Sequence, residues 1–271
     1  MRGRAVVALL TALHLIAGLA PAHAANADLV SIKTPRGVRQ AFILIKAEQP
    51  VASVILFAGG KGALGLKSAT TMKWGAENFL VRRREAFAAA GFTVAVMDAP
   101  SDRRDGMNAI FRMGRAHAAD ITAVAAYLKA QTNLPVWLIG TSKGTFSAAA
   151  GAIEARNIDG LVLTSTITRA EPDWKIARSH SDGVASMALS RITVPTLIVS
   201  HRHDECDLSP AADTPKLVKR LVSAAKVETV LLDGGGKAQS NPCEAHAPHG
   251  YWGIEEQAVA VIVKFIKNGG N

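Results

Sequence analysis

The chain has 271 residues, of which 49% are hydrophobic and 20% charged, and its formal net charge is +9. This composition supplies enough apolar surface for a substantial core, which excludes an intrinsically disordered chain. The basic residues are scattered and only two Tyr and four Trp accompany them, so we expect a solvated basic surface and no nucleic-acid partner, although the charge would attract anionic molecules.

Residues 1–24 have the pattern of a signal peptide. Arg2 and Arg4 precede the apolar stretch "AVVALLTALHLIAGLA", and the small residues "AHA" at 22–24 form a cleavage site. The apolar stretch is shorter than the roughly 20 residues that a transmembrane helix needs, and no later stretch is long enough. We therefore expect an exported protein, periplasmic or secreted, with no membrane span after cleavage. An uncleaved N-terminal anchor is the alternative.

Short apolar runs alternate with Ala-rich helical segments along the rest of the chain. The turn "PRG" between "LVSIKT" and "RQAFILIKA" predicts an antiparallel hairpin. Further strands are expected at 52–58, 92–98, 135–140, 160–165, 195–200 and 227–233, and helices at about 77–90, 118–131, 143–155, 211–225 and 254–267. This alternation predicts an α/β protein with a mostly parallel sheet covered on both faces. Ligand sites in such sheets lie beyond the carboxyl ends of the strands.

A candidate nucleophile follows the predicted strand at 135–140. The segment Gly140-Thr141-Ser142-Lys143-Gly144 leads from that strand into an Ala-rich helix. A serine on so tight a turn needs small residues two positions before and after it, and the turn exposes its hydroxyl beside backbone N–H groups at the helix start. The alternative is a Gly-rich turn in which Ser142 only caps the helix.

With this motif between a strand and a helix, the chain resembles the α/β-hydrolase superfamily of serine esterases, lipases and peptidases over about residues 40–268. The resemblance implies an α/β-hydrolase domain over residues 25–271, with an N-terminal antiparallel hairpin and a short cap segment at about 166–194. It also implies the chain order nucleophile, acid, histidine, and an oxyanion loop after an earlier strand.

The segment "LFAGGKGALG" after the strand at 52–58 is the candidate oxyanion loop. It contains the pattern G-x-G-x-x-G, but the acidic residue that a dinucleotide site needs about 20 positions later is missing, because Asp98 lies farther along the chain. The hydrolase resemblance implies that the backbone N–H groups of Gly60 and Lys143 bind the oxyanion. Ala58 stands where lipases of this type carry a histidine, which leaves the donor within 58–62 open.

The acid and the histidine are expected after the last two strands. The loop "SHRHDECDLS" at 200–209 follows the strand at 195–200, and in the family this position carries the acid. Asp204 is the predicted acid, with Asp207 as the alternative. His249, close before the final helix, matches the position of the catalytic histidine, and His246 is the alternative. The histidine would take the serine proton, and the aspartate would hold the imidazole tautomer.

The same loop also allows a metal hypothesis. His201 and His203 resemble half of the pattern H-x-H-x-D-H, but Glu205 and Cys206 stand where the second half needs Asp and His. We therefore expect neither a metal nor another cofactor.

Cys206 and Cys243 are the only cysteines of the chain. One lies beside the predicted acid and the other shortly before the predicted histidine, so the two would be neighbours if both loops meet at the active site. Because export permits disulfides, we expect a Cys206–Cys243 disulfide.

The sequence thus predicts a serine hydrolase that cleaves small-molecule carboxylic esters through a Ser142-His249-Asp204 triad and an acyl-enzyme. Amides and thioesters remain open as substrates. The alternatives are a secreted serine peptidase and a catalytically inactive binding protein of the same fold. The natural substrate and the oligomeric state are left open.

Overall fold

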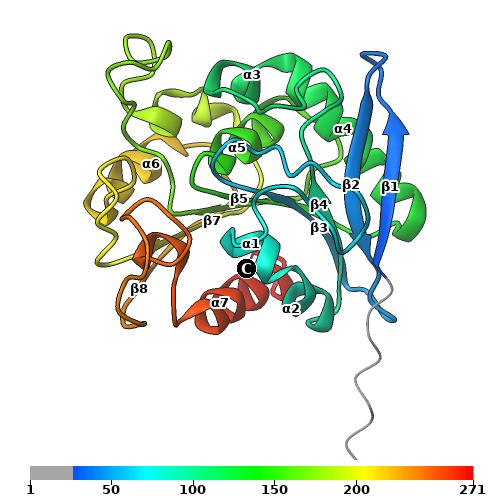
Figure 1. Cartoon of the computed structure of the whole chain (residues 1–271). Coiled ribbons are helices and arrows are strands. Elements are labelled where there is room, and N and C mark those ends of the chain that lie inside the picture. The colour runs from blue at the N-terminus through cyan, green and yellow to red at the C-terminus, as the bar shows by residue number, and fades with distance from the viewer. Residues whose placement is uncertain (1–26, 271) are drawn as a thin grey trace, which may run out of the picture.

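The computed structural model describes residues 27–270, so the expected signal peptide at 1–24 lies outside the described residues. A mixed eight-stranded sheet crosses the centre of the molecule in the order β1-β2-β4-β3-β5-β6-β7-β8 (Figure 1). β1 pairs antiparallel with β2, β2 pairs antiparallel with β4, and all other neighbours are parallel. The strands are β1 (Ala27–Lys33), β2 (Arg39–Ile45), β3 (Ala52–Phe57), β4 (Phe92–Met97), β5 (Val136–Thr141), β6 (Gly160–Thr164), β7 (Thr196–His201) and β8 (Val227–Leu232). The predicted antiparallel hairpin and mostly parallel sheet are confirmed.

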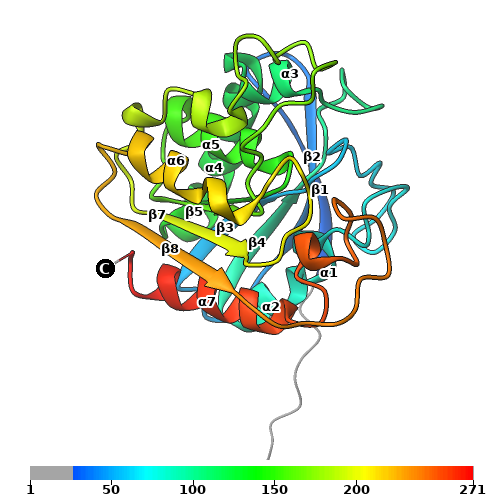
Figure 2. The same cartoon turned by 90° about the vertical axis from the view of Figure 1, so that its left-hand side faces the viewer.

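Helices cover both faces of the sheet because its central strands are apolar on both sides. Every residue of β3, β4, β5, β6 and β7 is buried. One face packs against α1 (Phe79–Arg82), α2 (Arg84–Ala89) and α7 (Glu255–Lys267). The other packs against α4 (Arg115–Thr132), α5 (Gly144–Glu154) and α6 (Thr214–Arg220), with α3 (Ala109–Met113) beside α4 and α5. Figure 2 shows the sheet between these two helical layers.

Three helical segments differ from the expectations. The helix expected at 77–90 is divided into α1 and α2, because the backbone of Arg83 leaves the helical conformation. The helix expected at 211–225 ends at Arg220, where Leu221 adopts a non-helical conformation. The short helix α3 was not expected. Its first turn is stabilised by Asn108, whose side chain accepts a hydrogen bond from the N–H of Phe111.

The segment between β6 and β7 contains the residues expected to form a short cap. Two 3-10 turns lie there, Gly183–Ser186 and Leu189–Arg191, and Val184 and Leu189 are buried in the core. Trp174 and Ile176 from the same segment line a cavity. The cap assignment itself stays a prediction. Within residues 27–270, no helix combines the length and the apolar character that crossing a membrane requires.

Candidate active site

Ser142 sits on the sharp turn between β5 and α5. Its backbone has φ +52°, in the left-handed region that a non-glycine residue occupies only at a cost in free energy. The two glycines of the motif allow the turn: a Cβ on Gly140 would come within 2.6 Å of the Gly144 oxygen, and a Cβ on Gly144 within 2.1 Å of the Phe57 oxygen. The steric requirement expected from the motif is therefore present, and the turn places Ser142 beside the N-terminus of α5.

The Gly-rich loop after β3 lies directly against Ser142. A Cβ on Gly59 would approach the Cβ of Ser142 to 2.9 Å, and Gly60 has φ +56°. The N–H groups of Gly60 and Lys143 donate no hydrogen bond to any residue in 27–270. Both residues line cavities at this edge of the sheet. These two donors are therefore free for a ligand.

Two buried charged side chains hold this loop in place. The carboxylate of Asp98, at the end of β4, accepts hydrogen bonds from the N–H groups of Leu64, Gly65 and Leu66 at 2.6–3.2 Å. Arg112 of α3 is 1% exposed and donates to the carbonyl oxygens of Ala58 and Gly60 and to Ser147 Oγ. Burial lowers the pKa of Arg112 to about 10, so the guanidinium stays charged at neutral pH. A charge on each side thus fixes the backbone of the loop.

The structure brings His249 and Asp204 together. His249 Nδ1 lies 2.9 Å from Asp204 Oδ2, and both side chains are buried. Asp204 also accepts hydrogen bonds from the N–H of Cys206 and from the hydroxyl of Ser209. His249 Nε2 is buried and has no hydrogen-bond partner among the described residues. The imidazole therefore has one nitrogen held by the carboxylate and the other available.

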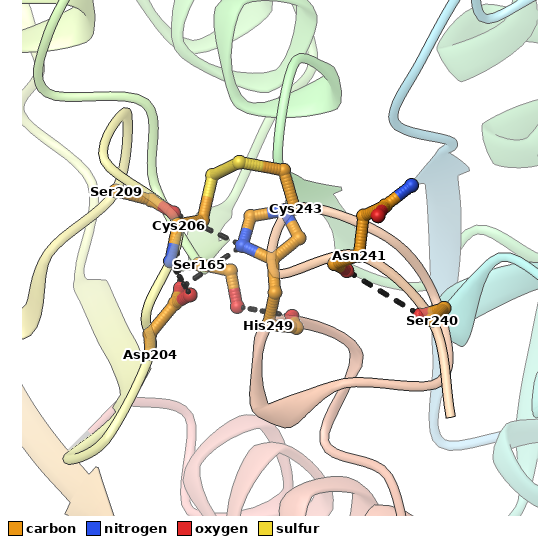
Figure 3. Close-up of a disulfide and its surroundings, with 8 residues drawn as sticks. All are labelled: Ser165, Asp204, Cys206, Ser209, Ser240, Asn241, Cys243 and His249. Atoms are coloured by element: carbon orange, nitrogen blue, oxygen red, sulfur yellow. Dashed lines mark hydrogen bonds and ion pairs between the residues drawn. A yellow bond between two sulfur atoms is a disulfide. The ribbon is translucent and has the colours of Figure 1, made fainter. Parts of the chain in front are cut away.

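Ser209 was not singled out in the sequence, although its hydroxyl lies next to both groups. Its Oγ is 2.9 Å from Asp204 Oδ2 and 3.0 Å from His249 Nδ1 (Figure 3). Since the hydroxyl proton goes to the carboxylate, Nδ1 must carry the proton that it donates, and Nε2 is left as the basic nitrogen. Ser209 lies on the Nδ1 side of the ring, which is the wrong side for a nucleophile that gives its proton to Nε2.

Ser142 and His249 both line a small cavity of about 50 Å³. No hydrogen bond joins the two side chains. In enzymes the hydrogen bond between a catalytic serine and histidine often forms fully only when substrate binds. Gly59, Gly60, Asn78 and Cys243 complete much of the cavity wall. The nucleophile motif, the histidine and the Gly-rich loop thus meet at one place.

The loop that carries His249 is fastened to the ends of β6 and β7. The hydroxyl of Ser165 donates to the His249 carbonyl oxygen at 2.7 Å. The phenol of Tyr251 accepts from the N–H of Ser165 at 3.1 Å and donates to the Val199 carbonyl oxygen at 2.8 Å. Burial raises the pKa of Tyr251, which keeps this phenol protonated as a donor. These contacts set the height of the imidazole above the sheet.

The expected disulfide between Cys206 and Cys243 is confirmed, with a Cα–Cα distance of 4.6 Å. Cys206 is buried beside Asp204, and Cys243 lines the small cavity. Figure 3 shows the bridge next to the imidazole of His249. The disulfide therefore joins the loop of the predicted acid to the loop of the predicted histidine.

The alternative residues lie elsewhere. Asp207 is exposed and makes no hydrogen bond to His249. His246 Nε2 lies 3.0 Å from Glu77 Oε2 and the ring packs on Trp252. His201 accepts from the N–H of His203 through Nδ1, and its Nε2 contacts the Gly234 oxygen, so both nitrogens are occupied.

One group of side chains in residues 27–270 has metal-ligand spacing: Asp204, Cys206 and His249 have ligand atoms within 4.8 Å of one another. Cys206 is in the disulfide and offers no thiolate, and Asp204 is hydrogen-bonded to His249. These residues do not fit a metal site. The expectation of no cofactor stays a prediction.

A larger cavity of about 370 Å³ adjoins the small one, and Gly60 lines both. Its walls come from the Gly-rich loop, α3, the start of α5 and the segment between β6 and β7. It contacts Lys143, the residue that follows Ser142, so it reaches the turn that carries Ser142.

Comparisons with known proteins identify the fold. No protein-family model matches the sequence, and no curated protein matches it. An esterase from Pyrococcus furiosus superposes with a TM-score of 0.62 at 16% identity, over 96% of this chain and 99% of that one. An α/β hydrolase from Penicillium superposes with a TM-score of 0.64 at 13% identity, over 90% and 99%. A zinc-bound structure of a cold-adapted esterase from an Arctic intertidal metagenomic library gives 0.55 at 14% identity, over 90% and 93%.

At these identities the likeness concerns the arrangement of the chain. The agreement extends over nearly the whole length of each compared chain, and the mixed sheet described above accords with it. This protein has the α/β-hydrolase fold.

Proposed function

We propose that the protein is a serine hydrolase that cleaves carboxylic esters through an acyl-enzyme, with Ser142 as nucleophile, His249 as general base and acid, and Asp204 as its partner. One observation carries the proposal. Ser142, strained at the turn after β5, lines the same small cavity as His249, and the Nδ1 atom of His249 is hydrogen-bonded to the buried carboxylate of Asp204. The esterases among the structures of similar fold support it.

The hydrogen bonds on the Nδ1 side define the proton path. Because Nδ1–H donates to Asp204, Nε2 accepts the proton of Ser142 as Oγ attacks the ester carbonyl carbon. His249 then gives this proton to the departing alkoxide, which leaves as the alcohol. A water molecule attacks the acyl-enzyme with the same imidazole as base, and the carboxylic acid and free Ser142 are formed.

The oxyanion of each tetrahedral intermediate would bind the N–H groups of Gly60 and Lys143. Two observations support this assignment. Neither N–H donates to an acceptor in residues 27–270, and Asp98 and Arg112 immobilise the loop that carries Gly60. Donors fixed before the reaction need no reorganisation, and each contributes about 3 kcal/mol of transition-state stabilisation in related systems.

The test is hydrolysis of 4-nitrophenyl esters of short and medium acyl chains by the wild type, Ser142→Ala and the control Ser223→Ala, which alters an exposed serine. We expect Ser142→Ala to lose about four orders of magnitude or more in kcat, and the control to match the wild type. A folded wild type without esterase activity or reaction with a fluorophosphonate would favour the inactive binding protein. Cleavage of peptides in preference to esters would favour the peptidase.

We also propose that the protein is exported and loses residues 1–24. The support is the charged, apolar and small-residue pattern of the leader and the Cys206–Cys243 disulfide, which is stable in oxidising compartments. The N-terminal sequence of protein recovered from the periplasm or the medium tests this. A start at Ala25 is expected, and retention of Arg2 and Arg4 in the cytoplasm would contradict it.

A further inference from the structure

Building on the proposed function, we infer that the preferred esters carry an anionic group, such as a carboxylate, on an apolar chain that occupies the larger cavity. The position, walls and charge of this cavity argue for such a substrate.

The position of the cavity makes it the binding site for a chain attached to the reacting carbonyl. Gly60 and Lys143, the two oxyanion donors of the proposed mechanism, both line it. The small cavity beside His249 has only about 50 Å³, whereas this one has about 370 Å³, which is in the range of small-molecule sites. The larger part of a substrate fixed at Ser142 therefore has space here.

The walls of the cavity are largely apolar. Met107, Phe146 and Ile176 are buried, and Ile110 and Trp174 face the cavity while partly open to solvent. An alkyl or aryl chain gains free energy by leaving water for such walls. Ile110 is 49% exposed, and a bound chain would cover it.

All the charged residues that line the cavity are basic. They are Lys61, Lys143, Lys175 and Arg112, and no carboxylate lines the cavity. None of the four forms an ion pair with any carboxylate in residues 27–270. Some other cations of the chain are paired, for example Arg36 with Asp120 at 2.8 Å and Arg169 with Asp213 at 2.8 Å. The four cations that line this cavity therefore have no carboxylate partner in the described part of the chain.

The cations differ in their accessibility. Arg112 is buried, and its hydrogen bonds to Ala58, Gly60 and Ser147 hold it in the wall, where it contributes charge. The Lys143 ammonium lies 4.3 Å from the centre of the Trp174 ring, which fixes it at the wall. Lys61 and Lys175 are exposed at the rim, so their ammonium groups can move to a ligand. A substrate with an apolar chain inside the cavity and an anionic group at the rim would contact the apolar walls and pair with the ammonium groups.

The test compares two esters that differ only at the far end of the acyl chain: mono(4-nitrophenyl) adipate, which ends in a carboxylate, and 4-nitrophenyl hexanoate of equal length. The quantity measured is the ratio of kcat/KM for the adipate to kcat/KM for the hexanoate. We expect a ratio above one for the wild type, falling about tenfold in the double variant Lys61→Met, Lys175→Met, since each rim cation contributes a few-fold. High salt should lower the wild-type ratio.

The matched control is the double variant Lys33→Met, Lys46→Met, which removes the same charge from exposed positions on the hairpin. It should keep the wild-type ratio. If the wild type hydrolyses both esters without preference, or keeps its preference in the Lys61 and Lys175 variant, the inference is wrong and the esterase proposal stands. If neither ester is hydrolysed and a fluorophosphonate does not react, the proposed function fails and the inference with it.

Discussion

At the scale of single residues, the hydrogen bonds of Ser209 determine which nitrogen of His249 carries the proton. Ser209 has one hydroxyl proton and donates it to Asp204, so it accepts from His249 Nδ1 and favours the tautomer with a basic Nε2. Ser209 is 2% exposed and does not line the cavity that Ser142 lines. In the proposed mechanism it is therefore a positioning residue, which acts through Asp204 and His249.

We predict that Ser209→Ala lowers kcat about tenfold with little change in KM, because Asp204 loses a hydrogen bond and aligns the imidazole less well. The pH profile of kcat/KM should shift, since the carboxylate that stabilises the imidazolium is altered. Kinetics over a pH series measures both effects. Complete loss of activity in a folded Ser209→Ala protein, with activity retained in Ser142→Ala, would identify Ser209 as the nucleophile.

At the scale of elements, the Gly-rich loop is stabilised from outside itself. Asp98 at the end of β4 accepts from three consecutive loop N–H groups, and Arg112 of α3 binds two loop carbonyl oxygens. The loop can thus stay open beside Ser142 without the pairing that a strand or helix would give it. This arrangement links the end of β4 and α3 to the proposed oxyanion donors.

Replacing Asp98 by Ala should cost about 3 kcal/mol of unfolding free energy, because buried N–H groups lose a charged acceptor. We expect kcat to fall as well, since the loop that carries Gly60 loses one of its two supports. Urea unfolding gives the stability change, and Asp105→Ala, at an exposed position nearby in sequence, is the control. Equal stability of the Asp98 variant and the wild type would refute this role.

The disulfide is the second link between elements, because it joins the loops after β7 and β8. Its loss should destabilise the protein by about 3–4 kcal/mol on the chain-entropy model, given a sequence separation of 37 residues. It should also lower kcat, since the Asp204 and His249 loops are no longer fixed together. We predict that a reductant lowers both the free energy of unfolding and the kcat of the wild type. The same reductant should leave both quantities unchanged in the Cys206→Ser, Cys243→Ser variant. Two free thiols in the native exported protein would contradict the bridge.

At the scale of the whole molecule, acid stability has an identifiable contributor in the core. His117 of α4 is fully buried, its ring nitrogens have no partner in residues 27–270, and it packs between Phe57 and Phe111. Burial, with the nearby charges of Arg112 and Arg36, lowers its pKa from 6.5 to about 3. At pH values between about 3 and 6.5, His117 is protonated in the unfolded chain and neutral in the folded chain. The free energy of unfolding therefore decreases as the pH falls through this range.

We predict that His117→Phe removes this dependence. From pH 6 to pH 4, the wild-type free energy of unfolding should decrease more steeply than that of the variant, by about 1.4 kcal/mol per pH unit for one proton. Urea unfolding at a series of pH values measures the difference. Parallel slopes for the two proteins would show that His117 is protonated in the folded state.

Much of this molecule could be predicted from local pattern. The strands are continuous apolar runs, and the turn at Ser142 follows from two glycines whose absent side chains make room for neighbouring backbone. The disulfide followed from placing two loops at one edge of the sheet. Asp98 and Arg112 could not be found this way, because their contacts join segments far apart in the chain. Ser209 lies only five residues from Asp204, but its contact with His249 spans 40 residues, and a serine at this spacing has no signature in the sequence. The Asn108 cap of α3 was visible as a local signal and was missed.

A fluorophosphonate bonds covalently to a nucleophilic serine, and peptide mass spectrometry of the labelled protein identifies which serine of the chain it is. We expect a single modified peptide that contains Ser142, no modification in Ser142→Ala, and continued modification at Ser142 in Ser209→Ala. Modification at Ser209, or ester hydrolysis by folded Ser142→Ala at the wild-type rate, would contradict the role of Ser142 as nucleophile.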